Sequence, residues 1–206
     1  MKKNFLYTYA VVFAVLLWGM FGSISLLEAK TLTEKIQSHS YPKIANYFLY
    51  SPLSAADVHA LAKWDLLVLS MQAQENSAAA LQQLRSLNPD IVLLAYVPSQ
   101  EFPLTYYKDW AKNTNGIWHR LLSGITPDMW LKDQSGNHVT FWANNWMLNA
   151  SQYPTTQQRW NEYLSSFVAE EILSTGLWDG VFYDNAFSDI SWINGGNIDT
   201  NKDGIK

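Results

Sequence analysis

Short apolar runs alternate with helical stretches along most of the chain. The runs are continuous and bounded by turn residues, which is typical of buried β-strands; they cover 43–50, 64–71 and 91–97. The stretches between them, 55–63 and 76–87, have the spacing and composition of helices, and Ser54 is in position to cap the first. This alternation predicts a parallel sheet covered by helices on both faces.

A fourth strand is predicted after an amphipathic helix over 159–174. It covers 180–184 and ends on a carboxylate, with Gly180, Phe182 and Asp184 on one face. Burying a carboxylate costs several kcal/mol unless it is paired or solvated in a cleft. The carboxyl ends of the strands form the active-site face of a (β/α) barrel, so Asp184 is placed for chemistry. A cap that opens the next turn is the alternative interpretation.

Four strand–helix steps make half of a barrel. A complete (β/α)₈ barrel needs about 250 residues, whereas this chain has 206 and stops inside what reads as a loop. We therefore expect an α/β fold in which 43–206 is the N-terminal half of a (β/α)₈ (TIM-type) barrel, truncated at the C-terminus. A complete short domain is the alternative, and it would leave the fourth strand as an exposed edge.

An aromatic-rich insertion follows the third predicted strand, over 101–155. Within it, 129–142 predicts a β-hairpin that turns at Gly136. Long loops in compact domains are usually functional, and sugars bind by stacking on Trp and Tyr rings. We expect one or two tryptophans to face a cleft, with the others packing the loop onto the sheet. The residues chosen as sugar platforms are Trp142 and Trp146.

The N-terminus has the pattern of an export segment. Lys2 and Lys3 precede an apolar run over 5–27 that is long enough to span a bilayer. We predict that 1–30 is a signal peptide or a membrane anchor, followed by a linker over 31–42. The protein is then exported, to the periplasm or the extracellular space, and meets the membrane only through this segment. A buried core helix is the alternative.

Composition narrows the class of partner. The formal net charge is −4 and no block of basic residues occurs, which argues against nucleic acid. Cysteine is absent, so the chain has no disulfide and no thiol chemistry. The histidines show no metal-ligand spacing.

One stretch matches the opening of a calcium loop, D-x-[DN]-x-[DN]-G. Asp199, Asn201 and Asp203 offer oxygen ligands at alternating positions, and Gly204 makes the turn. The twelfth-position ligand would lie beyond Lys206. A structural Ca²⁺ site and a simple acidic turn therefore both remain open, and no cofactor is required for the expected chemistry.

Three segments together resemble a known family. WDGVFYDNAF at 178–187, LLAYVPSQE at 93–101 and MWLKDQSGNHV at 129–139 are similar to hypothetical glycoside hydrolase family 15. The likeness extends over about 43–206, and more distantly to polygalactosaminidase-like and α-amylase-like barrels. It implies a carbohydrate-active (β/α)₈ barrel in which Asp184 matches the carboxylate of strand four. α-Amylases carry an arginine where this chain has Phe182, so an amylase-type mechanism is not implied.

These patterns lead to a functional expectation. Glycoside hydrolysis uses two carboxyl groups, and the candidates are Asp184 and Glu101, unless the second lies on a later strand. Tyr96 and Asn185 are expected close enough to orient Asp184 or a bound sugar. The expected function is an exported glycoside hydrolase acting on a polysaccharide or oligosaccharide. The alternative is a non-catalytic carbohydrate-binding or cell-envelope protein on the same scaffold.

Overall fold

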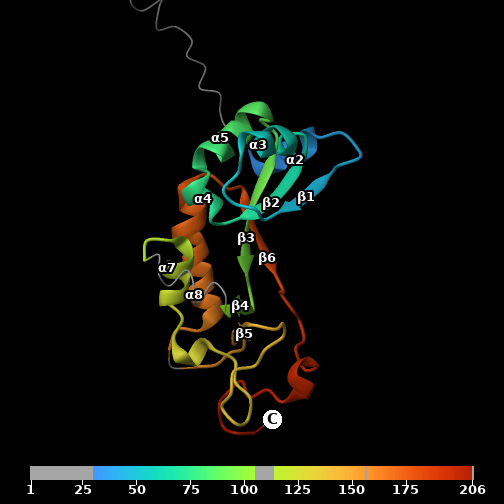
Figure 1. Cartoon of the computed structure of the whole chain (residues 1–206). Helices are drawn as coiled ribbons and strands as arrows, with labels where there is room; N and C mark the ends of the chain where they lie inside the picture. Colours follow the sequence, from blue (N-terminus) through green and yellow to red (C-terminus); the bar gives the residue numbers. More distant parts are fainter. Residues whose placement is uncertain (1–29, 105–113, 156, 206) are drawn as a thin grey trace, which may run out of the picture. The chain divides into compact units, whose positions relative to one another are not determined.

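Four parallel strands form the central sheet (Figure 1). The structure, a computed structural model, describes residues 30–104, 114–155 and 157–205, and its elements lie in the unit Leu32–Lys206. The sheet order is β1–β2–β3–β6, so the predicted α/β class and the four adjacent parallel strands are confirmed. The strands are β1 (Ala45–Phe48), β2 (Leu66–Ser70), β3 (Val92–Pro98) and β6 (Gly180–Asp184).

The helices between the first strands begin where the sequence indicates. Helix α3 (Ala55–Leu61) has Ser54 as its N-cap, in a capping box with Asp57. The next predicted helix, 76–87, is α5 (Ala78–Leu87), and a short helix that was not predicted, α4 (Ala73–Asn76), precedes it. The break is at Ser77, whose φ of −142° is not helical and whose hydroxyl accepts a hydrogen bond from the Leu53 amide at 2.9 Å.

The helix before the fourth strand is the longest helical segment that the structure describes. Helix α8 (Trp160–Phe167) continues into a π-helical turn, η2 (Val168–Ile172), and a 3₁₀ turn, η3 (Leu173–Thr175). It ends at Gly176, whose φ of +68° suits glycine. The helical spacing in the sequence predicted its buried face correctly: Trp160, Leu164, Phe167, Val168 and Ile172.

The two faces of the sheet differ. On one face the strand residues are completely buried, and they share one hydrophobic core with residues of α3, α5 and α8. These strand residues include Leu67, Leu69, Leu93, Ala95 and Val97. On the other face Tyr47 is 51% exposed and Phe182 is 37% exposed. Helical cover on both faces was predicted, but these exposures show that the second face is open.

The segment predicted as a linker, 31–42, contains helix α2 (Leu32–Ser38). Its Lys35 is buried and its ammonium lies 2.6 Å from the Asp179 carboxylate, just before β6. Arg85 contacts the same carboxylate at 3.1 Å, and the Leu93 amide donates to it at 2.8 Å. This buried ionic cluster holds α2 against the sheet, a contact between residues far apart in sequence that local polarity does not reveal.

The insertion lies beyond the carboxyl end of β3 (Figure 1). Strand β4 (Glu101–Pro103) follows β3 directly and pairs antiparallel with β5 (Asn145–Met147). Between them lie α7 (Ile117–Ser123), η1 (Pro127–Met129) and a turn at Gly136, where the Val139 amide donates to Leu131 as in a hairpin. After β6 comes η4 (Ile193–Gly196).

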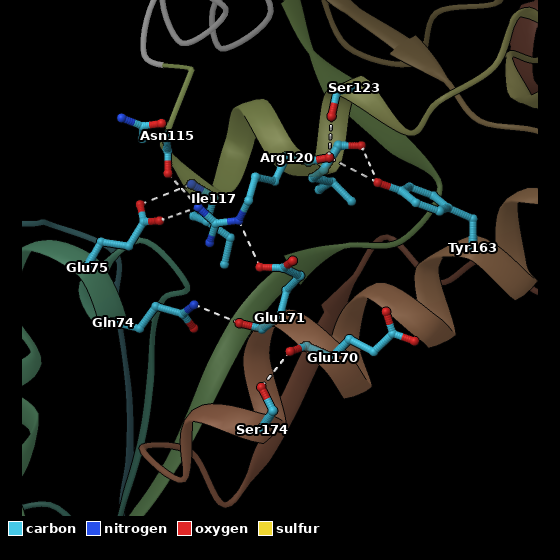
Figure 2. A network of polar contacts seen from close by, with 11 residues as sticks. Gln74, Glu75, Asn115, Ile117, Arg120, Ser123, Tyr163, Glu170, Glu171 and Ser174 are labelled. Atoms are coloured by element: carbon cyan, nitrogen blue, oxygen red, sulfur yellow. Dashed lines mark hydrogen bonds and ion pairs between the residues drawn. The ribbon is translucent and has the colours of Figure 1, made fainter.

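Arg120 of the insertion forms ion pairs with α4 and η2 (Figure 2). Its guanidinium contacts Glu75 on α4 at 3.0 Å and Glu171 on η2 at 2.8 Å. Glu75 also accepts a hydrogen bond from the Ile117 amide, and Gln74 donates to the Glu171 carbonyl. Three segments that are distant in sequence therefore meet at one side chain.

Arg120→Ala should lower the free energy of unfolding by about 1–2 kcal/mol, because it leaves two carboxylates facing each other without their cation. Urea denaturation followed by tryptophan fluorescence measures the change. Arg159→Ala is the matched control, since its ion pair with Glu162 is solvent-exposed and local, and it should leave stability almost unchanged. Equal losses in both variants would contradict the role assigned to Arg120.

The predicted signal peptide or anchor falls on residues 1–29, which lie outside the described residues. Among the residues from Lys30 onward that the structure describes, no helix is long and apolar enough to cross a membrane.

Candidate functional site

Asp184 is held at the carboxyl end of β6 by its neighbours on both sides. Its Oδ2 accepts a hydrogen bond from the Tyr96 hydroxyl at 2.9 Å, and its Oδ1 accepts one from the Asn185 amide at 2.9 Å. Its carbonyl accepts from the hydroxyl and amide of Ser99, which follows β3. The carboxylate is half-buried, so it is oriented without being sealed from solvent.

Tyr96 is part of an aromatic group on the open face of the sheet. Its ring lies 5.8 Å from Tyr47 on β1, which in turn lies 5.8 Å from Phe182 on β6, both in edge-to-face contacts. Burial, and then the hydrogen bond and charge of Asp184, raise the pKa of Tyr96 far above its usual value. The hydroxyl therefore stays protonated and remains a donor to the carboxylate.

Glu101, the first residue of β4, is only 6% exposed. Its Oε1 accepts from the Asn185 side-chain amide at 2.5 Å, and its Oε2 accepts from the Asn145 side-chain amide. Burial raises the pKa of Glu101, the two amide donors lower it, and the nearby Asp184 raises it, with a net increase. Both carboxylate oxygens are thus committed to asparagine amides.

Asn185 connects the two acidic residues. Its φ of +54° is in the left-handed region, which asparagine tolerates better than most residues. In this conformation its backbone amide reaches Asp184 while its side chain reaches Glu101. The proximity of Tyr96 and Asn185 to Asp184 is as expected from the sequence.

Asn145 is a member of the site that the sequence analysis missed. It is buried on β5, donates to Glu101, and accepts from the amides of Phe141 and Trp142. One asparagine among several in the insertion carries no local signal. Only the pairing of β4 with β5, which is a tertiary contact, brings it to Glu101.

The two tryptophans predicted as sugar platforms have different surroundings. Trp142 is 56% exposed and its ring lies 4.5 Å from Phe141. Trp146 is half-buried, stacked parallel on His138 at 3.7 Å and packed edge-on against Trp130. Trp142 therefore has a free surface, whereas Trp146 packs inside the insertion. Among the other tryptophans in or beside the insertion, Trp118, Trp130 and Trp160 are buried, and Trp110 lies outside the described residues.

The predicted calcium loop is folded around Asp199, which is almost fully buried. Its carboxylate accepts from the amides of Asp203 at 3.2 Å and Gly204 at 2.8 Å, and the Asn201 side chain donates to Asp203. Within the described residues no group of three or more histidine, aspartate or glutamate side chains is arranged to hold a metal ion. The oxygen ligands that calcium prefers are present, and calcium binding stays a prediction.

The protein has an α/β fold with a site built on carboxylates. The oriented aspartate and the buried glutamate lie at the carboxyl ends of adjacent parallel strands, and one asparagine joins them. The chain belongs to hypothetical glycosyl hydrolase family 15, whose model matches residues 85–205, more than half of its length. The resemblance seen in the sequence is thereby confirmed, and the matched region contains both acidic residues. No curated protein matches the chain.

Proposed function

We propose that the protein is an exported glycoside hydrolase that acts on a polysaccharide, with Asp184 as a catalytic carboxylate. The observation that carries the proposal is the orientation of Asp184 by Tyr96 and Asn185 at a strand's carboxyl end, in a member of a glycosyl hydrolase family. A carboxylate there can stabilise the positive charge of an oxocarbenium-like transition state. Export rests on the two lysines and the apolar run at the N-terminus.

We assign Glu101 a positioning part in the site. Glu101 is almost fully buried and both of its oxygens accept from asparagine side chains, so it has little freedom to meet a sugar, but it fixes the side chain of Asn185. Because the Asn185 amide also contacts Asp184, Glu101 acts on the catalytic carboxylate through this asparagine. The second catalytic carboxyl group then comes from elsewhere in the protein.

A (β/α)₈ barrel is the architecture that we propose for the sheet. The open face carries Tyr47, Tyr96 and Phe182, and the outer strands β1 and β6 each have one unpaired edge among the described residues. Further parallel strands would pair both edges and cover this face, as in a closed barrel. Asp184 would then lie at the barrel mouth.

The test is an assay of new reducing ends when the full-length protein is incubated with a panel of polysaccharides. Hydrolysis of at least one polymer supports the proposal. Retention on a polymer without hydrolysis would instead favour a carbohydrate-binding protein on the same scaffold. The burial of Glu101 favours this alternative, because it leaves Asp184 as the more accessible carboxylate of the acidic pair.

Glu101→Gln should lower kcat by up to about 100-fold. The NH₂ group of the new glutamine replaces a carboxylate oxygen, so it faces the NH₂ group of Asn185 or Asn145 and displaces that side chain. The pH profile adds a readout that a purely structural role would not move. Since the pKa of Glu101 is raised, its protonation and the loss of activity begin at higher pH than for an ordinary glutamate. The Glu101→Gln variant should lack this loss of activity at acidic pH, and an unaltered pH profile would contradict the positioning role of Glu101.

A further inference from the structure

A groove runs between the insertion and the segment after β6. Its larger part is a cavity of about 410 Å³ lined by Tyr153 and Asn201 among others, and its smaller part is one of about 230 Å³ that includes Gln100 and Ser188. Asn149 and Thr200 line both cavities, and the Asn149 side chain donates to the Thr200 carbonyl at 2.8 Å. The two cavities are therefore adjacent, with Asn149 and Thr200 as their shared wall, and together they are here named the insertion groove.

The lining of the insertion groove is polar but has no unpaired charge. Amides and hydroxyls dominate the larger cavity, and its charged residues, Asp128 and Lys202, neutralise each other at 2.7 Å. The half-buried ring of Tyr153 supplies an apolar surface beside them. Such a lining suits a neutral polyol, whose hydroxyls bond to amides while its ring faces stack on tyrosine. It suits anionic or cationic polymers less well.

The insertion groove also begins beside the candidate site. Gln100 lies between Ser99 and Glu101, and its side chain donates to the Phe187 carbonyl at 2.9 Å. Both Gln100 and Phe187 line the smaller cavity, and Phe187 follows Asn185 by two residues. A ligand held in the smaller cavity would thus lie beside the two segments, 99–101 and 185–187, that carry residues of the candidate site.

We propose that the insertion groove binds a neutral carbohydrate chain on one side of the bond to be cleaved. This inference rests on the proposed glycoside hydrolase function and makes it more specific. The substrate is an uncharged polysaccharide of several sugar units, and Tyr153 is a stacking platform remote from the reacting bond. Long substrates gain binding energy from the groove that short ones do not.

Binding is measured in the full-length protein carrying Asp184→Asn, so that hydrolysis cannot consume the polymer. The probes are soluble xylan, mixed-linkage β-glucan and soluble starch as neutral polymers, with polygalacturonate and chitosan as charged ones, in affinity gel electrophoresis. At least one neutral polymer should retard the protein. Adding Tyr153→Ala should weaken that binding about 10-fold, as should Ser188→Trp, which places a bulky ring at an exposed position of the smaller cavity.

Tyr41→Ala is the matched control, because Tyr41 is 87% exposed and precedes β1, at the opposite end of the strands. It should leave retardation unchanged. With Asp184 intact, Tyr153→Ala should slow hydrolysis of the polymer about 10-fold, whereas Tyr41→Ala should leave the rate unchanged.

Three results overturn the groove proposal: no retardation by any neutral polymer, retardation by charged polymers alone, or binding that neither Tyr153→Ala nor Ser188→Trp weakens. They leave the proposed hydrolase function standing if wild-type protein still cleaves a polymer. Binding that depends on Tyr153 without any hydrolysis would instead refute the hydrolase function, and the groove would remain a carbohydrate-binding site.

Discussion

Asp184→Asn is expected to reduce hydrolysis by a factor of about 10²–10³ or more while the fold stays intact. The change removes the negative charge that would stabilise the transition state and keeps the size of the side chain. Its structural cost is small, because the new amide oxygen can accept from the Asn185 amide while the Tyr96 hydroxyl accepts from the new NH₂ group. The measurement compares turnover on the responsive polysaccharide with the thermal midpoint of the same samples.

Asp189→Asn is a suitable control for this experiment. Asp189 lies in the same segment and is exposed, and among the described residues its carboxylate accepts hydrogen bonds from the nearby Ser191. It should leave both turnover and thermal midpoint near those of the parent. A parent-like rate in Asp184→Asn would exclude Asp184 from catalysis, and a collapsed midpoint would make it a structural cap.

Asp179→Asn should have the largest effect on stability, a loss of about 3–5 kcal/mol in the free energy of unfolding. The substitution leaves the ammonium of Lys35 buried and the guanidinium of Arg85 partly buried without their shared carboxylate. Chemical denaturation of the parent and the variant gives the difference. A change as small as that of Asp133→Asn, a partly exposed aspartate in the Gly136 turn, would contradict the structural importance of the cluster.

A double variant separates the buried charge from the lost hydrogen bonds. Adding Lys35→Met to Asp179→Asn removes the unpaired ammonium and keeps an apolar chain of similar length. The double variant should therefore be more stable than Asp179→Asn alone. No recovery would mean that the Arg85 guanidinium or the Leu93 amide, rather than the charge of Lys35, accounts for the loss.

The parts of the fold that follow a local pattern could be predicted from the sequence. Continuous apolar runs located β1, β2 and β3, period-two alternation located β6 with Asp184 at its end, and helical spacing located α8. Contacts between distant segments could not be predicted in this way. Helix α2 is held by Asp179, and α4 separates from α5 because Ser77 bonds to Leu53.

The candidate site shows the same limit. Tyr96 and Asn185 were expected near Asp184 because they lie on or beside adjacent strand ends. The hydrogen bond from Asn185 to Glu101 depends on the left-handed backbone of Asn185, and the one from Asn145 depends on a strand pair formed within the insertion. Residue type also did not predict which tryptophan is accessible. Trp142 and Trp146 are only four residues apart, yet the fold leaves Trp142 exposed and stacks Trp146 on His138.

The position of β6 has a consequence for the order in which the chain folds. Strands β1 and β2 are joined by the short segment 49–65, whereas β3 and β6 are joined by 99–179. Closing the longer loop costs about 1.4 kcal/mol more in chain entropy. Among the described strands β6 pairs only with β3 and follows the longest of these connections, so of the four it is expected to join the sheet last and to open first. The proposed catalytic carboxylate therefore sits on the strand whose local unfolding most readily takes the site apart.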